Sequence, residues 1–216
     1  MQAFGFVGGQ LALDFVNTAS ARAIGPLKEG LAGYSDLVDW AEQAHALPDG
    51  VPDELRQAAA QHPRIAVRTL DEARALREAL YRVLKAYAAG ADAPPAPAPA
   101  PAPAPDMAML NAAFRRANAH RTLCCIRPNR YGAPTFEWTW DAGGAELDRV
   151  LWPVALAAGE LLTRGEPSRL KECGGHDCSW LFLDQSKNRS RRWCSMQDCG
   201  NRVKAKRHYA SRRVES

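Results

Sequence analysis

Four of the six cysteines lie near the C-terminus, in two pairs with the same internal spacing. Four residues separate Cys173 from Cys178 and Cys194 from Cys199, and fifteen residues lie between the pairs. Structural zinc prefers four tetrahedral ligands, and two short loops can each supply two thiolates. Gly174-Gly175 gives the first loop the backbone freedom of a tight turn. The pattern therefore predicts one structural zinc ion bound by Cys173, Cys178, Cys194 and Cys199.

Disulfides are the alternative use of paired cysteines, and they need an oxidising compartment. Ala19-Ser20-Ala21 is similar to a signal-peptidase site. However, no Lys or Arg precedes Arg22, and polar residues such as Asp14 and Asn17 interrupt the apolar stretch that a signal needs. We therefore expect a cytoplasmic protein whose cysteines stay reduced.

A catalytic zinc site is the second alternative. Such sites usually have three protein ligands and an open position, whereas four cysteines close the coordination shell. His176 lies inside the first loop and could replace one cysteine. The sequence contains no recognisable nucleophile–base pair, phosphate loop or metallohydrolase helix, so we do not expect an enzyme. Cys124 and Cys125 are adjacent on a predicted strand and are interpreted as packing residues.

The charge of the chain is divided unevenly. Residues 187–216 contain ten of the 28 Lys and Arg and two of the 24 acids, a net +8, which leaves 18 basic and 22 acidic residues, a net −4, elsewhere. A basic end on an acidic body indicates a surface for a polyanion. We expect DNA, although RNA or an acidic protein fits the charge too. The candidate contacts are Arg189, Arg191, Arg192, Asn201, Arg202, Lys204, Lys206, Arg207, Arg212 and Arg213.

The residues after Cys199 form an amphipathic basic stretch, which predicts a helix. Positions 202, 206, 209 and 213 would share one face of it. Zinc contributes roughly 10 kcal/mol or more of apparent folding energy to such small modules. The order of knuckle, hairpin, second cysteine pair and helix is similar to a treble clef. Its small core would contain Trp180, Leu181, Phe182, Trp193 and Tyr209. The alternative is a solvated basic tail.

Helical periodicity dominates the preceding part of the chain. Residues 36–46 and 52–61 predict two helices, and Thr69–Glu72 fits a capping box that opens a third helix ending at Gly90. Residues 91–105 are almost pure Ala-Pro, which predicts an extended spacer or loop insertion. A further helix is expected over 107–120.

The period changes after this helix. Residues 123–126 and 135–140 read as strands of a hairpin, joined by a turn at 128–132. An apolar helix follows over 145–162, restarted at Pro153. No run approaches the length of a membrane span. We predict an α+β fold, with a mainly helical N-terminal domain over 1–165 that includes a small antiparallel hairpin, and a zinc domain over 168–216.

Two segments carry a specific resemblance. The run from Trp180 to Arg202, with its Cys199-Gly200-Asn201-Arg202 tetrapeptide, resembles the CGNR zinc-finger family. Leu11–Thr18 and Ala75–Tyr81 are similar to the ABATE domain that accompanies this finger. The resemblance implies a bacterial, stress-linked transcription regulator with DNA as its partner.

Two functions follow as hypotheses. The first is a zinc-dependent DNA-binding regulator whose N-terminal domain senses a ligand or mediates association. The second is a protein–protein interaction module, in which zinc is purely structural and the basic helix docks an acidic partner. Polar residues in apolar segments, namely Asp14, Asn17 and Arg77, mark a possible ligand pocket, although such groups are often caps or satisfied core residues. The oligomeric state stays open.

Overall fold

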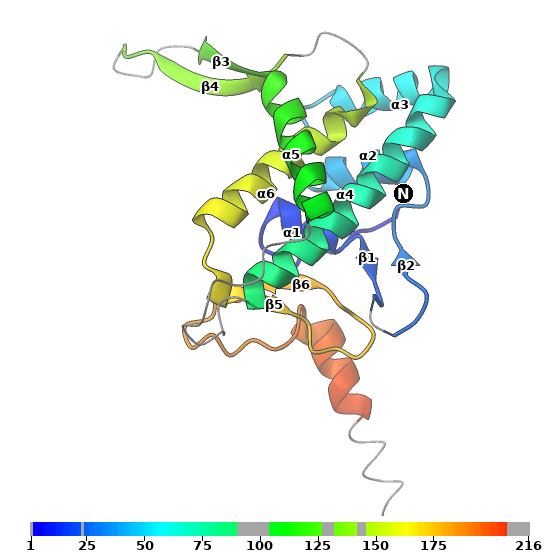
Figure 1. Cartoon of the computed structure of the whole chain (residues 1–216), viewed down its shortest axis with the longest axis vertical. Coiled ribbons are helices and arrows are strands. Elements are labelled where there is room, and N and C mark those ends of the chain that lie inside the picture. The colour runs from blue at the N-terminus through cyan, green and yellow to red at the C-terminus, as the bar shows by residue number, and fades with distance from the viewer. Residues whose placement is uncertain (1, 23, 90–103, 127–131, 142–145, 207–216) are drawn as a thin grey trace, which may run out of the picture.

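The computed structural model describes residues 2–22, 24–89, 104–126, 132–141 and 146–206 of the 216-residue chain. Helices dominate these residues, and the strands form three separate two-stranded antiparallel sheets (Figure 1). This confirms the predicted fold class of a mostly helical chain with small antiparallel sheets. The α-helices are α1 (Leu11–Val16), α2 (Tyr34–Gln43), α3 (Val51–Gln61), α4 (Pro63–Ala89), α5 (Ala104–Ala119) and α6 (Trp152–Arg164).

The core is built around α4, the longest helix. Its buried residues, among them Leu70, Leu76, Leu80 and Leu84, recur at the three- and four-residue spacing of one helix face. The short helix α1 lies against this core, and the Phe15 ring is 5.2 Å from that of Trp40 in α2. Because this short helix is buried on most of its sides, its sequence shows no clear helical periodicity.

Helix α4 begins earlier than its sequence predicted. The capping box at Thr69 is wrong, because the helix starts at Pro63 and Thr69 is buried inside it. Proline is favoured in the first turn, where its missing N–H costs no hydrogen bond. The main-chain N–H of Ala66 donates to the His62 carbonyl (3.1 Å), which closes that first turn.

Helix α5 also begins earlier than predicted. Ala104 and Pro105, expected in the extended spacer, form its first turn, and the rest of the predicted spacer lies outside the described residues. An ion pair explains this start. The Asp106 carboxylate accepts from Nε (2.8 Å) and Nη2 (2.6 Å) of Arg82, which ties the first turn of α5 to α4.

The predicted hairpin is confirmed as β3 (Arg121–Ile126) paired with β4 (Thr135–Trp140), while most of its turn lies outside the described residues. A 3₁₀ turn, η1 (Leu147–Leu151), leads into α6, so Pro153 does restart a helix. One face of the hairpin is exposed, with 56% of Trp138 and 59% of Phe136 accessible to solvent. Cys125 is also exposed and is therefore not a packing residue.

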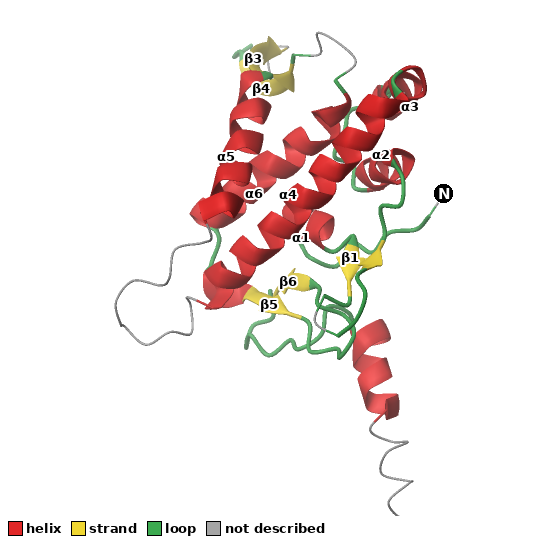
Figure 2. Cartoon of the chain, turned by 45° about the vertical axis from the view of Figure 1, so that its right-hand side comes forward, coloured by secondary structure: helices red, strands yellow, loops and turns green. Residues whose placement is uncertain are grey.

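The remaining strands form two short antiparallel pairs. Strand β1 (Ala19–Ser20) pairs with β2 (Lys28–Glu29), and β5 (Leu170–Glu172) pairs with β6 (Leu181–Leu183) after the 3₁₀ turn η2 (Pro167–Arg169). Figure 2 shows β5 and β6 between the helices and the loops of the C-terminal part. Among the described helices, none is both long and apolar enough to cross a membrane.

Candidate metal centre and nucleic-acid interface

The first cysteine pair lies at the turn of the β5–β6 hairpin. Cys173 follows β5 directly, and its N–H donates to the Trp180 carbonyl (2.8 Å), which extends the ladder by one bond. The prediction placed a hairpin between the cysteine pairs and is wrong on this point. The strands flank the first pair, because Leu170 and Leu181 both pack into the main hydrophobic core.

The second pair enters through a loop that folds over the first. The N–H of Gly174 donates to the Arg192 carbonyl (2.9 Å), which places Cys194 next to Cys173. Cys199 lies in a single π turn (Met196–Gly200) whose N-cap Ser195 accepts from the Asp198 N–H (3.2 Å). The chain continues from this turn directly into a helix over 201–206.

The four sulfur atoms converge on one point. The Sγ atoms of Cys173, Cys178, Cys194 and Cys199 all lie within 4.8 Å of one another, and all four residues are buried. The Cys178–Cys194 and Cys194–Cys199 distances are both 3.6 Å. Tetrahedral zinc with bonds near 2.3 Å separates its sulfur ligands by roughly 3.8 Å, whereas a disulfide needs about 2 Å. The cluster therefore fits one structural zinc ion.

The surroundings of the cluster also fit a cation. Hydrogen bonds from the Cys178 and Cys194 thiols, together with the N–H groups of Cys194 (3.3 Å) and Gly175 (3.4 Å), lower the pKa of Cys173. Burial raises the pKa of Cys199. Four thiolates cannot share one buried volume without a compensating positive charge. A Cβ on Gly175 would lie 3.3 Å from the Cys199 Sγ, so glycine keeps this space clear.

A buried carboxylate, Asp184, organises the loop between the cysteine pairs. It accepts from the Lys171 ammonium (2.6 Å), from the Ser186 N–H (3.0 Å) and from the Arg191 N–H (2.9 Å). Burial alone would raise its pKa, but these bonds hold the pKa well below its usual range. Asp184 was not among the site residues predicted from the sequence. The signal was an aspartate two residues before a serine, a common turn pattern.

Arg191 lies within the metal module, which comprises β5, β6, the four clustered cysteines and the helix over 201–206. Its guanidinium donates to the carbonyls of Trp193 (3.0 Å) and Cys194, and it stacks 4.4 Å from the centre of the Phe182 ring. It also reaches the Val7 carbonyl (3.4 Å) of the N-terminal segment. The same guanidinium also donates to the Leu183 carbonyl (3.4 Å), so Arg191 links the loop of Cys194 with β6 and with the N-terminal segment.

The other predicted basic residues differ in whether their charge is already paired with a carboxylate. Arg189 is paired with Glu166 (3.1 Å) and Arg202 with Asp177 (3.1 Å), although both remain exposed. Arg192 is exposed, with its guanidinium 5.9 Å from the Trp193 ring centre. Asn201, Lys204 and Lys206 are exposed on the helix over 201–206. Arg207, Arg212 and Arg213 lie outside the described residues, as does Tyr209 of the predicted module core.

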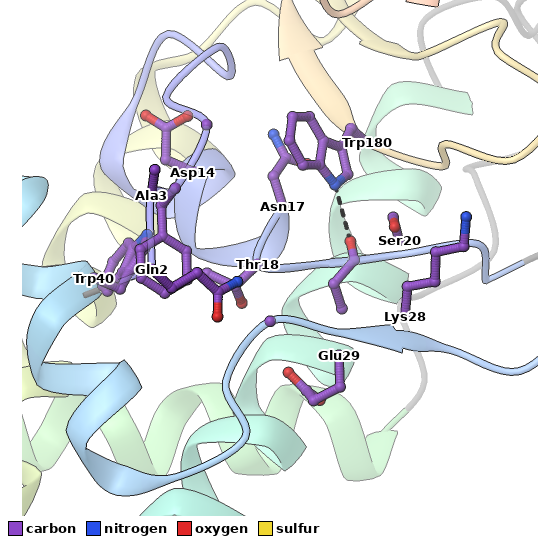
Figure 3. A pocket seen from close by; sticks show the side chains of 14 residues that line it. Gln2, Ala3, Asp14, Asn17, Thr18, Ser20, Lys28, Glu29, Trp40 and Trp180 are labelled. Carbon is purple, nitrogen blue, oxygen red and sulfur yellow. Dashed lines mark hydrogen bonds between the residues drawn. The ribbon is translucent and has the colours of Figure 1, made fainter.

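The predicted ligand pocket corresponds in part to a cavity of about 230 Å³ that Asp14 and Asn17 line together with Trp40 and Trp180 (Figure 3). Its polar groups are largely engaged within the protein. The Asn17 amide bonds to the main chain of Leu181, and burial raises the pKa of Asp14 to about 6, against the lowering effect of the Gly8 N–H (2.8 Å).

Arg77 does not line this cavity. It is 1% exposed and makes a two-pronged ion pair with Glu29 (2.6 and 2.7 Å), with a third bond to Glu78 (2.9 Å). The structure therefore brings Asp14 and Asn17 to one cavity. Arg77 lies outside its lining and holds β2 through the buried ion pair with Glu29.

Comparison with known families agrees with this geometry. Residues 169–212 match the family described as CGNR zinc finger, which includes all four cysteines. Residues 9–165 match the ABATE family, described as "Putative stress-induced transcription regulator". No curated protein matches the chain significantly.

Proposed function

Because the chain belongs to the ABATE family of putative stress-induced transcription regulators, we propose that it is a zinc-dependent DNA-binding regulator. In this proposal, residues 168–216 form a DNA-binding domain that is similar to a treble clef except that its described hairpin carries the first cysteine pair. Residues 1–165 form a domain that senses a ligand or mediates association. Neither matching family is described as enzymatic, and we assign no catalysis. A bacterial cytoplasm would keep all six cysteines reduced, and none of them forms a disulfide in the structure.

The observation that carries the proposal is that the basic helix begins directly after the metal cluster. Cys199 is a ligand position, and the helix over 201–206 follows it within one residue. The helix extends away from the helical body (Figure 1). Lys204 and Lys206 therefore project from a fixed base into solvent, where they can neutralise phosphates and release counterions.

The contacts within the module divide the predicted basic residues into two groups. Arg191 is used by the module itself, and we assign it to positioning. Arg192, Lys204 and Lys206 are assigned to phosphates, with Asn201 closest to base edges. Arg189 and Arg202 could exchange their carboxylate partners for phosphates. Arg207, Arg212 and Arg213 extend the basic sequence beyond the described helix.

The test is the salt dependence of duplex binding. For wild type, the logarithm of the association constant should fall steeply with the logarithm of salt concentration. The Lys204→Gln/Lys206→Gln variant should bind more weakly and show a slope reduced by roughly 2. Arg64→Gln/Arg115→Gln is the matched control, because it removes the same charge from exposed positions on α4 and α5.

Two results would reject the proposal: a flat salt dependence of the wild type, or equal weakening by both double variants. The protein–protein alternative makes a different prediction. An acidic partner protein would stay bound after nuclease treatment and would still require Lys204 and Lys206.

A further inference from the structure

A second cavity lies between the helices of the N-terminal part, away from the metal cluster. It has a volume of about 260 Å³, is lined by α4, α5 and the η1–α6 segment, and opens to solvent beside the exposed residues Ala75, Met109 and Ala112. No predicted site residue lines it. Its walls are mainly apolar and include Ala75, Leu76, Met109, Ala112, Leu151 and Trp152.

Small side chains create this cavity. Ala75 on α4 and Ala112 on α5 face the same space, where longer side chains would fill the gap between the helices. Trp152 closes the inner wall and is only 2% exposed. Met109 lines the cavity while 40% exposed, and its flexible thioether can adapt to different shapes.

The charges at the cavity are largely compensated. The Asp148 side chain is 8% exposed, and it accepts from the Trp152 indole N–H (3.1 Å) and pairs with Arg116. Glu72 is half-exposed at the wall, with Arg68 at 3.7 Å. An ionic ligand would therefore find no strong uncompensated partner of opposite charge. Shape and apolar contact would select the ligand instead.

We propose that this cavity binds a compact, neutral, apolar molecule the size of one or two aromatic rings. This inference rests on the proposed function in one respect only: the cavity would be the site at which the N-terminal part senses its ligand. Its volume exceeds that of an engineered cavity of about 150 Å³ that accepts benzene. The Trp152 ring is already stacked on His120 (4.1 Å between centroids), so the ligand would contact mainly the other apolar walls, such as Leu76 and Met109.

Helix α4 connects this site with the metal module. From the cavity residues Ala75 and Leu76, the same helix continues to Tyr81 and Lys85. The Tyr81 hydroxyl donates to Glu172 (2.7 Å), and the Lys85 ammonium lies 3.1 Å from the same carboxylate. Glu172 directly precedes the first metal-site cysteine. A ligand that changes the packing of α4 would therefore act on an element that contacts the module.

The probe for the test is 6-propionyl-2-(dimethylamino)naphthalene, a neutral dye with two fused rings whose fluorescence changes in apolar surroundings. The full-length wild type should bind one dye per chain. Ala112→Phe should weaken binding at least roughly tenfold, because the ring occupies the cavity. Ala60→Phe adds the same ring at an exposed position of α3 and should bind like wild type.

The exposed hairpin requires its own control, since apolar dyes also bind surface patches. Trp138→Ser removes the exposed indole and should leave dye binding unchanged. The inference is overturned if Ala112→Phe binds as tightly as wild type, or if Trp138→Ser abolishes binding. The titration contains no DNA. Loss of DNA binding with an intact dye site would therefore overturn the proposed function alone, and the converse would overturn this inference alone.

Discussion

The side-chain amide of Asn17 makes both hydrogen bonds of a β-bridge with the main chain of Leu181. The Leu181 N–H donates to Oδ1 (2.8 Å), and Nδ2 donates to the Leu181 carbonyl (2.8 Å). The side chain of Asn17, the C-cap residue of α1, thus pairs with the free edge of β6 as a strand would, and both residues are buried. The metal module and the helical body are consequently joined through the core.

This relationship predicts the effect of Asn17→Ala. The substitution leaves a buried N–H and a buried carbonyl without their partner, which should lower the free energy of unfolding by about 2–4 kcal/mol. Urea denaturation followed by circular dichroism measures it. Asn118→Ala, which removes an exposed amide on α5 that bonds within its own helix, should change stability by less than about 0.5 kcal/mol. Equal effects of the two substitutions would contradict the bridge.

Arg77 should prove to be structural. Arg77→Met removes a buried guanidinium and leaves Glu29 without its main partner, so we expect a loss of about 3–5 kcal/mol of stability. The exposed Arg68→Met on the same helix, which removes a pair with Glu72 at 3.7 Å, should cost less than about 1 kcal/mol. Thermal denaturation of the two variants compares them directly. If Arg77→Met unfolds like wild type, the buried pair does not support β2.

Asp14 predicts a pH dependence of stability. Burial raises its pKa from 3.8 to about 6 in the folded protein, so the folded state holds the proton more strongly than the unfolded chain does. Its ionisation therefore destabilises the fold as pH rises from about 4 to about 6. Asp14→Asn keeps an acceptor for the Gly8 N–H and removes the charge.

The Asp14→Asn variant should be more stable than wild type at pH 7 by about 1–2 kcal/mol, a figure reduced because the carboxyl is partly exposed. The difference should shrink at pH 4.5. Urea midpoints at the two pH values measure it, and a difference independent of pH would show that Asp14 does not titrate in this range.

Two neighbouring arginines should separate metal binding from DNA binding. Arg191→Ala removes the donors that hold the Trp193 and Cys194 carbonyls, so zinc should be lost to a chelator faster than from wild type. Arg192→Ala should retain zinc normally but bind duplex DNA more weakly. Chelator competition and DNA titration on both variants check this, and the opposite assignment would reverse our division of the basic residues.

Some parts of this structure were predictable because their signals are local. Cysteine spacing alone predicted the cluster, the short apolar run of residues 123–126 predicted most of β3, and alternation of polar and aromatic residues predicted β4. The start of α4 was not predictable. The capping-box pattern at Thr69 is the same whether the helix begins at this residue or earlier in the chain. The part of the helix before Thr69 has one buried residue, Ala66, and depends on this tertiary packing.

In the candidate site, too, contacts that depend on tertiary packing could not be predicted from local sequence. Charge counting placed Arg191 with Arg192 because the two are adjacent in sequence. Their contacts differ because Arg191 points toward carbonyls of loops that the metal cluster brings together, whereas Arg192 is exposed. The Asn17–Leu181 contact spans 164 residues. No periodicity or motif predicts such a contact, since it depends on how the module is placed on the helical body.

Native mass spectrometry of the intact protein tests the central claim most directly, when it is followed by thiol counting after denaturation. We predict one zinc ion per chain and six reduced cysteines, with zinc lost in Cys194→Ser but retained in Cys125→Ser. A metal-free native protein, or a mass lower by four hydrogens because two disulfides join Cys173, Cys178, Cys194 and Cys199, would contradict the account.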